Sequence, residues 1–340
     1  MFAIGTRGAE GVSIIARGAV PGRALLDAAR ALGCDRISAE VVGAFQDAGI
    51  PSILLKGPSI ARWLYPSGGR TYVDTDLLVP ASEFSRAGAL LESLGFTELL
   101  EGFHPFERGL GPDVEIAFAR PELGHGGARF VDLHRNLPRL STSDEFLWEA
   151  LSAGTETIGV GGDKVCVLGR TPLALHVVLH AVQHGFHSHT SEDLRRAVVV
   201  MSADDWRPVA DLAARLGVTE AMGFGLRHDA MGAEIADGLG LPRLSPSDPL
   251  VRALYAPRGS VSLTDFWSAS TLRGKVQRIR WMLLPSPAKI RYVSGLPDAH
   301  GRTLLVAYAQ WWRDLAPAFV SAVRFVRGRQ RLPKGDGDGE

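Results

Sequence analysis

Two aspartates lie one residue apart inside an apolar stretch of the chain, Asp74-Thr75-Asp76-Leu77-Leu78-Val79. Side chains of a β-strand alternate between its two faces, so Asp74 and Asp76 are expected on one face, about 6 to 7 Å apart along the strand. Two ionised carboxylates in apolar surroundings repel each other and lose hydration unless a cation or hydrogen-bond donors compensate them. Mg²⁺ prefers carboxylate oxygens and completes its shell with water and substrate phosphates. The pair therefore indicates phosphoryl or nucleotidyl chemistry.

Residues that could contact phosphate precede this acidic strand. Gly57 permits close approach of the backbone to a phosphate, and the N–H groups near Pro58 and Ser59 begin a predicted helix, whose N-terminal end attracts anions. Lys56 and Arg70 are candidate phosphate contacts. Each also has a structural alternative, because Lys56 could pair with a core carboxylate and Arg70 could anchor the turn.

These motifs together resemble the uncharacterised nucleotidyltransferase family within the polymerase-beta-like superfamily. The resemblance rests on Leu55-Lys56-Gly57, on Arg70, on the acidic strand ending Leu77-Leu78-Val79, and on Val131-Asp132-Leu133-His134, and it covers about residues 36 to 165. The chain departs from the superfamily pattern in three places: it has Gly57-Pro58-Ser59 instead of a direct Gly-Ser pair, fourteen residues separate Ser59 from Asp74, slightly more than usual, and Thr75 stands where an apolar residue is usual.

The resemblance implies a small mixed sheet with two Mg²⁺ ions, or Mn²⁺ in their place. Asp74 and Asp76 would bridge the metals and Asp132 would complete the site of the ion that activates the acceptor. Lys56, Gly57, Ser59 and Arg70 would bind the nucleotide. His134 follows Asp132 by two residues and should share its strand face, where a supporting role behind the metal ligands is expected.

The predicted activity is transfer of a nucleoside monophosphate from a nucleoside triphosphate (NTP) to an acceptor, with release of pyrophosphate. The acceptor is open: a small molecule, a peptide, a protein hydroxyl or an RNA end. Two alternatives remain, a non-catalytic nucleotide-binding or interaction module of the same fold and a metal-dependent phosphoester hydrolase. No Walker P-loop, Gly-x-Gly-x-x-Gly or Gly-x-Ser-x-Gly motif is present, which disfavours the common ATPase, dinucleotide and serine-hydrolase functions.

A run of histidines could add to the site. His176, His180, His184 and His187 recur at helical spacing and share one helix face. Because no His-Glu-x-x-His motif or cysteine partner accompanies them, a dedicated zinc site is disfavoured. We expect them to line the cleft between two domains, with His180 and His184 as candidates for substrate contact. Asp193 could pair with a histidine, but capping of a helix is favoured.

The pattern of the first half is an alternation of helices and strands. We expect helices over 24–33, 38–48, 57–65 and 83–94, and strands over 52–55, 71–79, 96–100, 103–108, 114–118 and 129–134. The second half is mainly helical, with predicted helices over 172–184, 191–201, 205–216 and 219–239. The predicted fold class is an α/β (α+β) nucleotidyltransferase-like mixed-sheet core followed by a mainly α-helical C-terminal domain.

We expect four segments: a helical lead-in at 1–35, the catalytic core at 36–168, the helical domain at 169–327 and a disordered tail at 328–340. The chain of 340 residues has a formal net charge of zero, which excludes a purely electrostatic nucleic-acid binder. The segment from Arg273 to Arg331 contains twelve Lys or Arg residues and only two Asp residues. This basic segment could hold a polyanion, although a solvent-facing helix surface is the favoured interpretation.

The compartment is predicted from cysteine usage and from apolar segments. With only Cys34 and Cys166, a disulfide framework is excluded and a reducing cytoplasm fits best. No export signal is expected at the N-terminus. Charged residues and Pro317 interrupt the apolar stretch 304–326, whereas a membrane span needs about 20 mostly apolar residues, so no transmembrane helix is expected.

Overall fold

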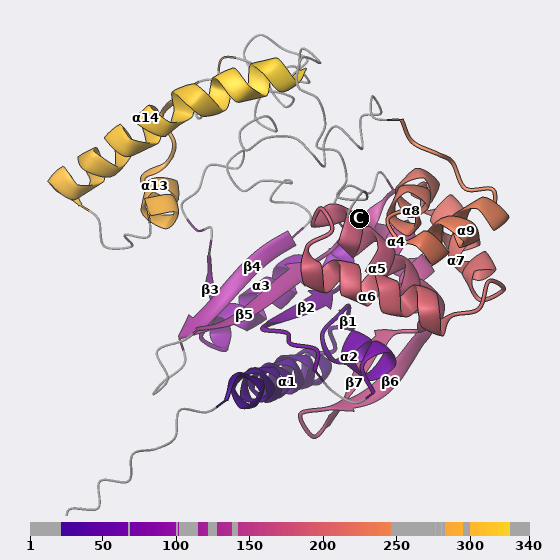
Figure 1. Cartoon of the computed structure of the whole chain (residues 1–340). Coiled ribbons are helices and arrows are strands. Elements are labelled where there is room, and N and C mark those ends of the chain that lie inside the picture. The colour runs from indigo at the N-terminus through magenta and orange to yellow at the C-terminus, as the bar shows by residue number, and fades with distance from the viewer. Residues whose placement is uncertain are drawn as a thin grey trace, which may run out of the picture.

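One mixed β-sheet of seven strands forms the centre of the N-terminal half, and helices cover both of its faces (Figure 1). The computed structural model describes residues 22–66, 69–99, 101, 115–121, 128–137, 142–245, 276, 280, 283–294 and 300–326. The predicted strand over 103–108 and the predicted tail over 328–340 lie outside these residues, as does most of the lead-in.

The strands follow the order β3-β4-β5-β2-β1-β7-β6 across the sheet. Two neighbouring pairs are parallel, β2 with β5 and β1 with β7, and the other pairs are antiparallel. The strand bounds are β1 Ile53–Leu54, β2 Asp74–Leu78, β3 Thr97–Glu98, β4 Glu115–Pro121, β5 Ala128–His134, β6 Thr155–Val160 and β7 Asp163–Leu168.

The helices fall into a group that alternates with the strands and a group that follows them. The first group is α1 Arg23–Asp47, α2 Pro58–Leu64, the short 3₁₀ helix η1 Ala81–Glu83, α3 Phe84–Ser93 and α4 Asp144–Ser152. The second group is α5 Arg170–Gln183, α6 Ser188–Val200, α7 Trp206–Arg215, α8 Thr219–Leu226, α9 Ala230–Gly238, α13 Pro287–Ser294 and α14 Gly301–Val326. This arrangement confirms the predicted fold class, whereas the predicted domain boundaries stay a prediction.

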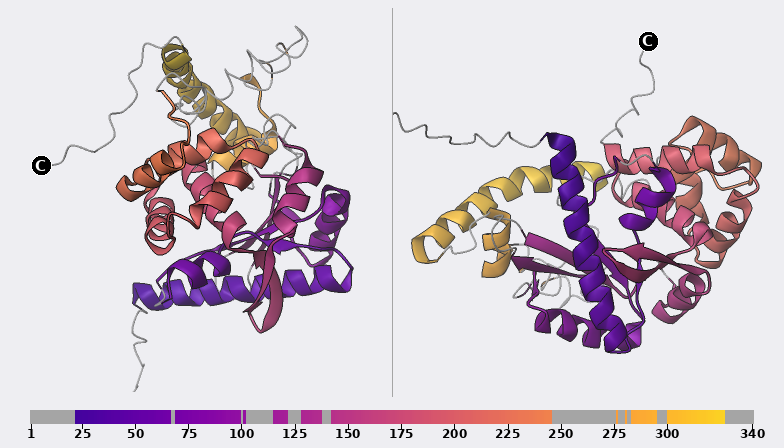
Figure 2. Two further views of the ribbon diagram at one scale, coloured as in Figure 1. Left: turned by 90° about the vertical axis from the view of Figure 1, so that its right-hand side faces the viewer. Right: turned by 90° about the horizontal axis from the view of Figure 1, so that it is seen from below.

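Alternation along the central strands sends apolar side chains to both faces of the sheet. On one face, Leu77 and Leu133 pack against Phe45 of α1 and Leu91 of α3, all fully buried. Figure 2 shows α1 lying across this face. On the opposite face, Leu78 belongs to a second core that extends into helices α5 to α9. The helical region therefore shares a hydrophobic core with the sheet.

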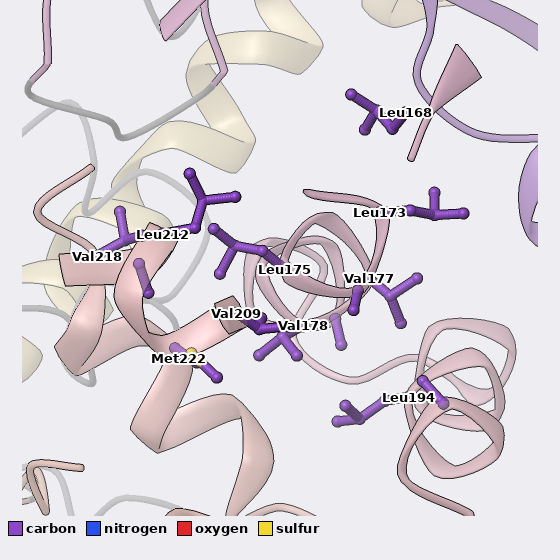
Figure 3. Close-up of a cluster of buried hydrophobic side chains, with 14 of the residues drawn as sticks. Leu168, Leu173, Leu175, Val177, Val178, Leu194, Val209, Leu212, Val218 and Met222 are labelled. Atoms are coloured by element: carbon purple, nitrogen blue, oxygen red, sulfur yellow. The ribbon is translucent and has the colours of Figure 1, made fainter. Parts of the chain in front are cut away.

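The core of the helical region is built mainly of aliphatic side chains from several helices (Figure 3). Leu175 and Val178 of α5 lie among residues of α6, α7 and α8 in this cluster. Burial of such side chains is worth roughly 1.5–3 kcal/mol each. This packing fixes α5 over the sheet face that carries Asp76.

Two predicted helix boundaries are wrong. Residues 24–33 and 38–48 belong to one continuous helix, α1, which has Gly33 in its interior, close to the Arg129 guanidinium. The predicted helix over 219–239 is two helices. Asp229 begins the second one, its side chain accepting a hydrogen bond from the Gly232 N–H at 3.1 Å, as an N-cap does.

The prediction that residues 304–326 do not cross a membrane is confirmed for the described part of the chain. There, no helix combines the length and the apolarity that a bilayer span requires, and this includes α14.

Candidate active site

Three carboxylates converge on one face of the central strands. The parallel pairing of β2 with β5 places Asp76 directly opposite Asp132, and Asp74 lies two residues earlier on the same face of β2. One carboxylate oxygen from each residue lies within 4.8 Å of the others. We call Asp74, Asp76 and Asp132 the acidic triad. Its hard oxygen donors at this spacing suit Mg²⁺ or Mn²⁺.

The burial of the triad also favours a cation. Asp76 is only 4% exposed, and its Oδ2 has the Lys56 ammonium 3.2 Å away as its ionic partner. Buried carboxylate oxygens are normally hydrogen-bonded or bound to a metal. The triad therefore fits a divalent metal, although its role as a metal site stays a prediction.

Thr75 explains how the acidic strand is held in place. It points to the face opposite the triad, is buried, and its Oγ1 lies 2.9 Å from Ser38 Oγ of α1. The Cys34 thiol, which lies one helical turn before Ser38 in α1, donates a hydrogen bond to the Asp74 carbonyl at 3.1 Å. The polar residue that departs from the superfamily pattern thus fastens the strand to α1. Burial raises the pKa of the Cys34 thiol to about 11, so the thiol is neutral there.

Lys56 supplies a positive charge to the triad. Its Nζ lies 3.2 Å from Asp74 Oδ2 and 3.2 Å from Asp76 Oδ2. Burial alone would lower the pKa of Lys56, but the charges of Asp76 and Asp74 raise it above its ordinary value. Burial would likewise raise the pKa of Asp76, and Lys56 and His134 lower it well below the ordinary range. The predicted pairing of Lys56 with a carboxylate is present, and its contact with phosphate stays a prediction.

His134 and Glu115 extend the charged group beyond the triad. His134 Nε2 lies 3.3 Å from Asp76 Oδ1, and its Nδ1 lies 3.5 Å from Glu115 Oε2. Burial would lower the pKa of His134, but the hydrogen bond and charge of Asp76 raise it. Burial and the neighbouring Asp76 charge raise the pKa of Asp132 to about 7. Glu115 was not predicted, because only the antiparallel register of β4 with β5 places it opposite His134.

A pocket of about 200 Å³ separates the acidic triad from helix α5. Lys56, Glu115 and His134 line the sheet side together with the triad, and His176, His180 and His184 line the helix side. The structure thus places His180 and His184 where the sequence predicted them, beside the cleft. Their contact with substrate stays a prediction.

The turn after β1 is tight and depends on glycine. Gly57 has φ 72°, in the region that favours glycine, and a Cβ there would meet the Tyr72 ring at 3.3 Å. Ser59 is buried in α2, and its Oγ has no hydrogen-bond partner among the residues that the structure describes. Both residues lie close in sequence to Lys56, but among the described residues they do not line the pocket. Their predicted contact with nucleotide is untested by this geometry.

Arg70 is held by an acidic residue of the helical region. Its Nη2 lies 2.8 Å from Asp193 Oδ2, and its Nε lies 3.0 Å from Asp193 Oδ1. The Tyr65 hydroxyl donates to the same carboxylate at 2.7 Å. The favoured interpretation of Asp193 as a helix cap is wrong, because α6 begins after His187 and Asp193 lies inside it. Arg70 anchors the turn in this structure, and its phosphate contact stays a prediction.

A mixed sheet whose adjacent parallel strands carry convergent carboxylates, covered by helices on both faces, is the arrangement that the sequence resemblance to nucleotidyltransferases implies. The comparison with protein families agrees. Residues 20–230 match the family described as "Uncharacterised nucleotidyltransferase", and the chain belongs to this family.

Two solved structures match the chain only distantly. The solution structure of the antibiotic-resistance factor ANT(2'')-Ia is 16% identical, with a TM-score of 0.37, and the match covers 60% of this chain and 100% of that one. An antigenic nucleotidyltransferase-like protein from Paracoccidioides brasiliensis is 13% identical, with a TM-score of 0.35 and coverage of 63% and 95%. None of the curated proteins compared with the chain matches it.

Proposed function

We propose that the protein is a Mg²⁺-dependent nucleotidyltransferase, with Mn²⁺ as an alternative metal, that moves a nucleoside monophosphate from an NTP to an acceptor. The observation that supports this proposal most directly is the convergence of Asp74, Asp76 and Asp132 from two parallel strands. In the reaction, an acceptor atom bonds to the α-phosphorus and loses its proton. The bond from the α-phosphorus to the bridging oxygen breaks, and pyrophosphate leaves.

The residues of the sheet side have distinct roles in this proposal. The acidic triad would hold the metal, which supplies charge stabilisation to the phosphates and activates the acceptor. Lys56, now between two carboxylates, would turn to the triphosphate when the metal replaces its charge. Gly57 and Ser59 would bring backbone and hydroxyl groups toward phosphate, and Arg70 would fix their turn through its 3.5 Å contact with the Gly57 carbonyl.

Hydrolysis of a phosphoester through the histidines receives less support. Among the described residues, the only group of side chains able to hold a metal is the acidic triad, and no histidine belongs to it. Loss of a carboxylate would support a non-catalytic binding module of the same fold, but all three carboxylates of the triad are present. A cytoplasmic location is part of the proposal.

Thermal unfolding with each of the four NTPs, ATP included, tests the proposal. The full chain is measured with and without Mg²⁺ or Mn²⁺, beside the double variant Asp74→Ala/Asp76→Ala. A matched control, Asp204→Ala/Asp211→Ala, removes two exposed carboxylates. A Mg²⁺-dependent rise of Tm with at least one NTP, lost in the first variant and kept in the control, is expected. The absence of a rise with every NTP would contradict the proposal.

A further inference from the structure

Three histidines of α5 form one wall of the pocket, opposite the acidic triad. His176, His180 and His184 follow each other at intervals of four residues, and all three line the pocket. We call them the histidine wall. Their rings contact one another, with centroids 5.8 Å apart for the first pair and 4.4 Å for the second. Successive helical turns therefore present three imidazoles to one cavity.

The histidine wall has one hydrogen-bonding atom that the described part of the protein does not use. Among the described residues, His176 Nε2 is buried without a hydrogen-bond partner, and His180 is only 8% exposed. Buried polar atoms in proteins are nearly always hydrogen-bonded, so an unpaired one on a residue that lines a cavity suggests a partner from outside the described chain. The stacked rings do not supply such a bond, since ring contact leaves the nitrogen atoms unsatisfied.

The chemistry of the wall points to hydroxyl groups. Burial, followed by the positive charge of Lys56, lowers the pKa of each of the three imidazoles, to about 3 for His176. A neutral imidazole has one donor and one acceptor nitrogen, and a hydroxyl group also both donates and accepts. Several imidazoles in a row therefore match a ligand with several hydroxyl groups.

The surroundings of the wall disfavour a charged ligand. The other residues that line the helix side are uncharged: Leu179, Val182, Gln183, Val218 and Ala221. A charged group bound to the imidazoles would lose hydration, and the charges that it could pair with, Lys56 and the carboxylates, lie on the sheet side of the pocket and not on the wall. The pocket of about 200 Å³ is also smaller than the roughly 300–1,000 Å³ typical of drug-sized ligands. The ligand is accordingly small and neutral.

We propose that the histidine wall binds a small, uncharged polyol and presents one of its hydroxyl groups to the acidic triad as the nucleotidyl acceptor. This inference rests on the proposed function for the transfer step. There, the polyol oxygen bonds to the α-phosphorus and its proton passes to water, while the bond from the α-phosphorus to the bridging oxygen breaks and pyrophosphate leaves. The binding of the polyol itself is independent of that step.

Saturation-transfer NMR of the full chain with small probe compounds tests this inference. The neutral probes are methyl α-D-glucopyranoside and myo-inositol, the cationic probe is glucosamine and the anionic probe is glucuronate. Neutral probes are expected to bind, and the two charged probes are expected to bind at least about tenfold more weakly. Binding of charged probes alone, or of no probe, would overturn the proposal.

Variants show whether the wall carries the binding. His180→Leu should weaken the binding of neutral probes about tenfold, the scale of one hydrogen bond, and His180→Gln should restore part of it because an amide also donates and accepts. The control His187→Leu/His189→Leu removes two exposed histidines and should leave binding unchanged. If His180→Leu lowers Tm strongly, the affinity of the neutral probes for His180→Gln is compared with that for wild type instead, and this comparison shows whether His180 carries the binding. Unchanged binding in both His180 variants would overturn the proposal.

Two further measurements complete the test. The first distinguishes a bound acceptor from the ribose of the nucleotide as the source of the hydroxyl groups, and the second distinguishes failure of this inference from failure of the proposed function. With Mg²⁺ and a non-hydrolysable NTP analogue present, a bound acceptor should stay bound. Displacement of the probe would make the wall a site for the nucleotide's ribose and overturn the acceptor assignment. The Mg²⁺-dependent NTP shift of Tm should persist in His180→Leu. If wild type binds polyols but shows no NTP shift, the proposed function fails while polyol binding stands.

Discussion

The two walls of the pocket carry opposite kinds of polar chemistry. The sheet wall holds charges close together, with Lys56 Nζ at 3.2 Å from two carboxylates and His134 at 3.3 Å from one of them. The histidine wall holds neutral imidazoles, because burial lowers their pKa. Burial acts on both walls, but only on the sheet wall do neighbouring charges outweigh it.

With different chemistry on its two walls, one pocket could bind two unlike partners. A dense group of carboxylates recognises a cation and, through it, the phosphates of a nucleotide. Neutral groups that both donate and accept hydrogen bonds recognise an uncharged molecule. Transfer between two substrates requires both to lie within bonding distance at once, and the two walls face each other across a single pocket.

The largest effect is expected from a substitution that removes one charge from the sheet wall. Asp76→Asn should lower the rate of nucleotidyl transfer at least about 100-fold, the scale on which loss of one electrostatic contact slows a reaction. Release of pyrophosphate measures it. If repulsion between the aspartates were the only factor, this variant would be more stable than wild type. We expect no gain in stability, because Lys56 and His134 each lose the carboxylate that they contact. A rate within threefold or so of wild type would show that the charged wall is not catalytic.

The acidic strand could be predicted from sequence because two carboxylates inside an apolar run have few structural explanations. The proximity of Asp132 followed only from resemblance to a family, since it depends on the register of β2 and β5. Arg70 was a predicted site residue, but its partner Asp193 lies 123 residues away. No local pattern encodes such a pairing, because it forms only when α6 packs beside the turn.

The hairpin β6–β7 was not predicted, although its turn carries a signal. Gly161 and Gly162 both have positive φ, which a Gly-Gly pair at a hairpin turn allows. The exposed side chains of β6 hide the apolar alternation by which strands are usually recognised. In contrast, the continuous α1 was divided at Gly33, because a glycine that packs against Arg129 resembles a helix end in sequence.

The next effect concerns the ion pair between Arg70 and Asp193, which joins the turn beside the sheet wall to α6. Arg70 is 9% exposed and Asp193 3%. Asp193→Asn should destabilise the fold by about 3–5 kcal/mol, since one buried charge is left unpaired. Urea unfolding measures the change, with the exposed Asp211→Asn as control. A loss below about 1 kcal/mol would mean that the two walls are positioned without this bond.

A smaller effect is expected when the sheet wall loses its internal cation. Lys56→Met should destabilise the metal-free protein by about 1.5–3 kcal/mol, the scale of hydrogen bonds to charged groups. Mg²⁺ should then raise Tm more in this variant than in wild type, because the triad lacks its own counter-charge. Lys164→Met, at an exposed lysine of β7, is the control. Equal Mg²⁺ shifts in the variant and wild type would contradict a shared position for Lys56 and the metal.

The last effect, which is spread over the acid range, tests the neutral state of the histidine wall through pH. The pKa of His176 is lowered to about 3 by burial and by Lys56, whereas an unfolded histidine has a pKa of about 6.5. Below pH 6.5 the unfolded chain therefore binds a proton that the folded protein does not. His176 should thus reduce stability as pH falls from about 6.5 toward 3, by up to roughly 1.4 kcal/mol for each pH unit. Above pH 6.5 it should have no such effect.

His134 on the opposite wall should act in the reverse direction. Its pKa is raised by Asp76, so its contribution is present below about pH 6.5 and is lost as pH rises through the folded value. Urea midpoints between pH 4.5 and 8 distinguish the two walls. His176→Gln should flatten the loss of stability on the acid side, and the exposed His187→Gln should leave it unchanged. If His176→Gln has the same acid slope as wild type, the histidine is charged in the fold, and the contrast between a charged wall and a neutral wall is wrong.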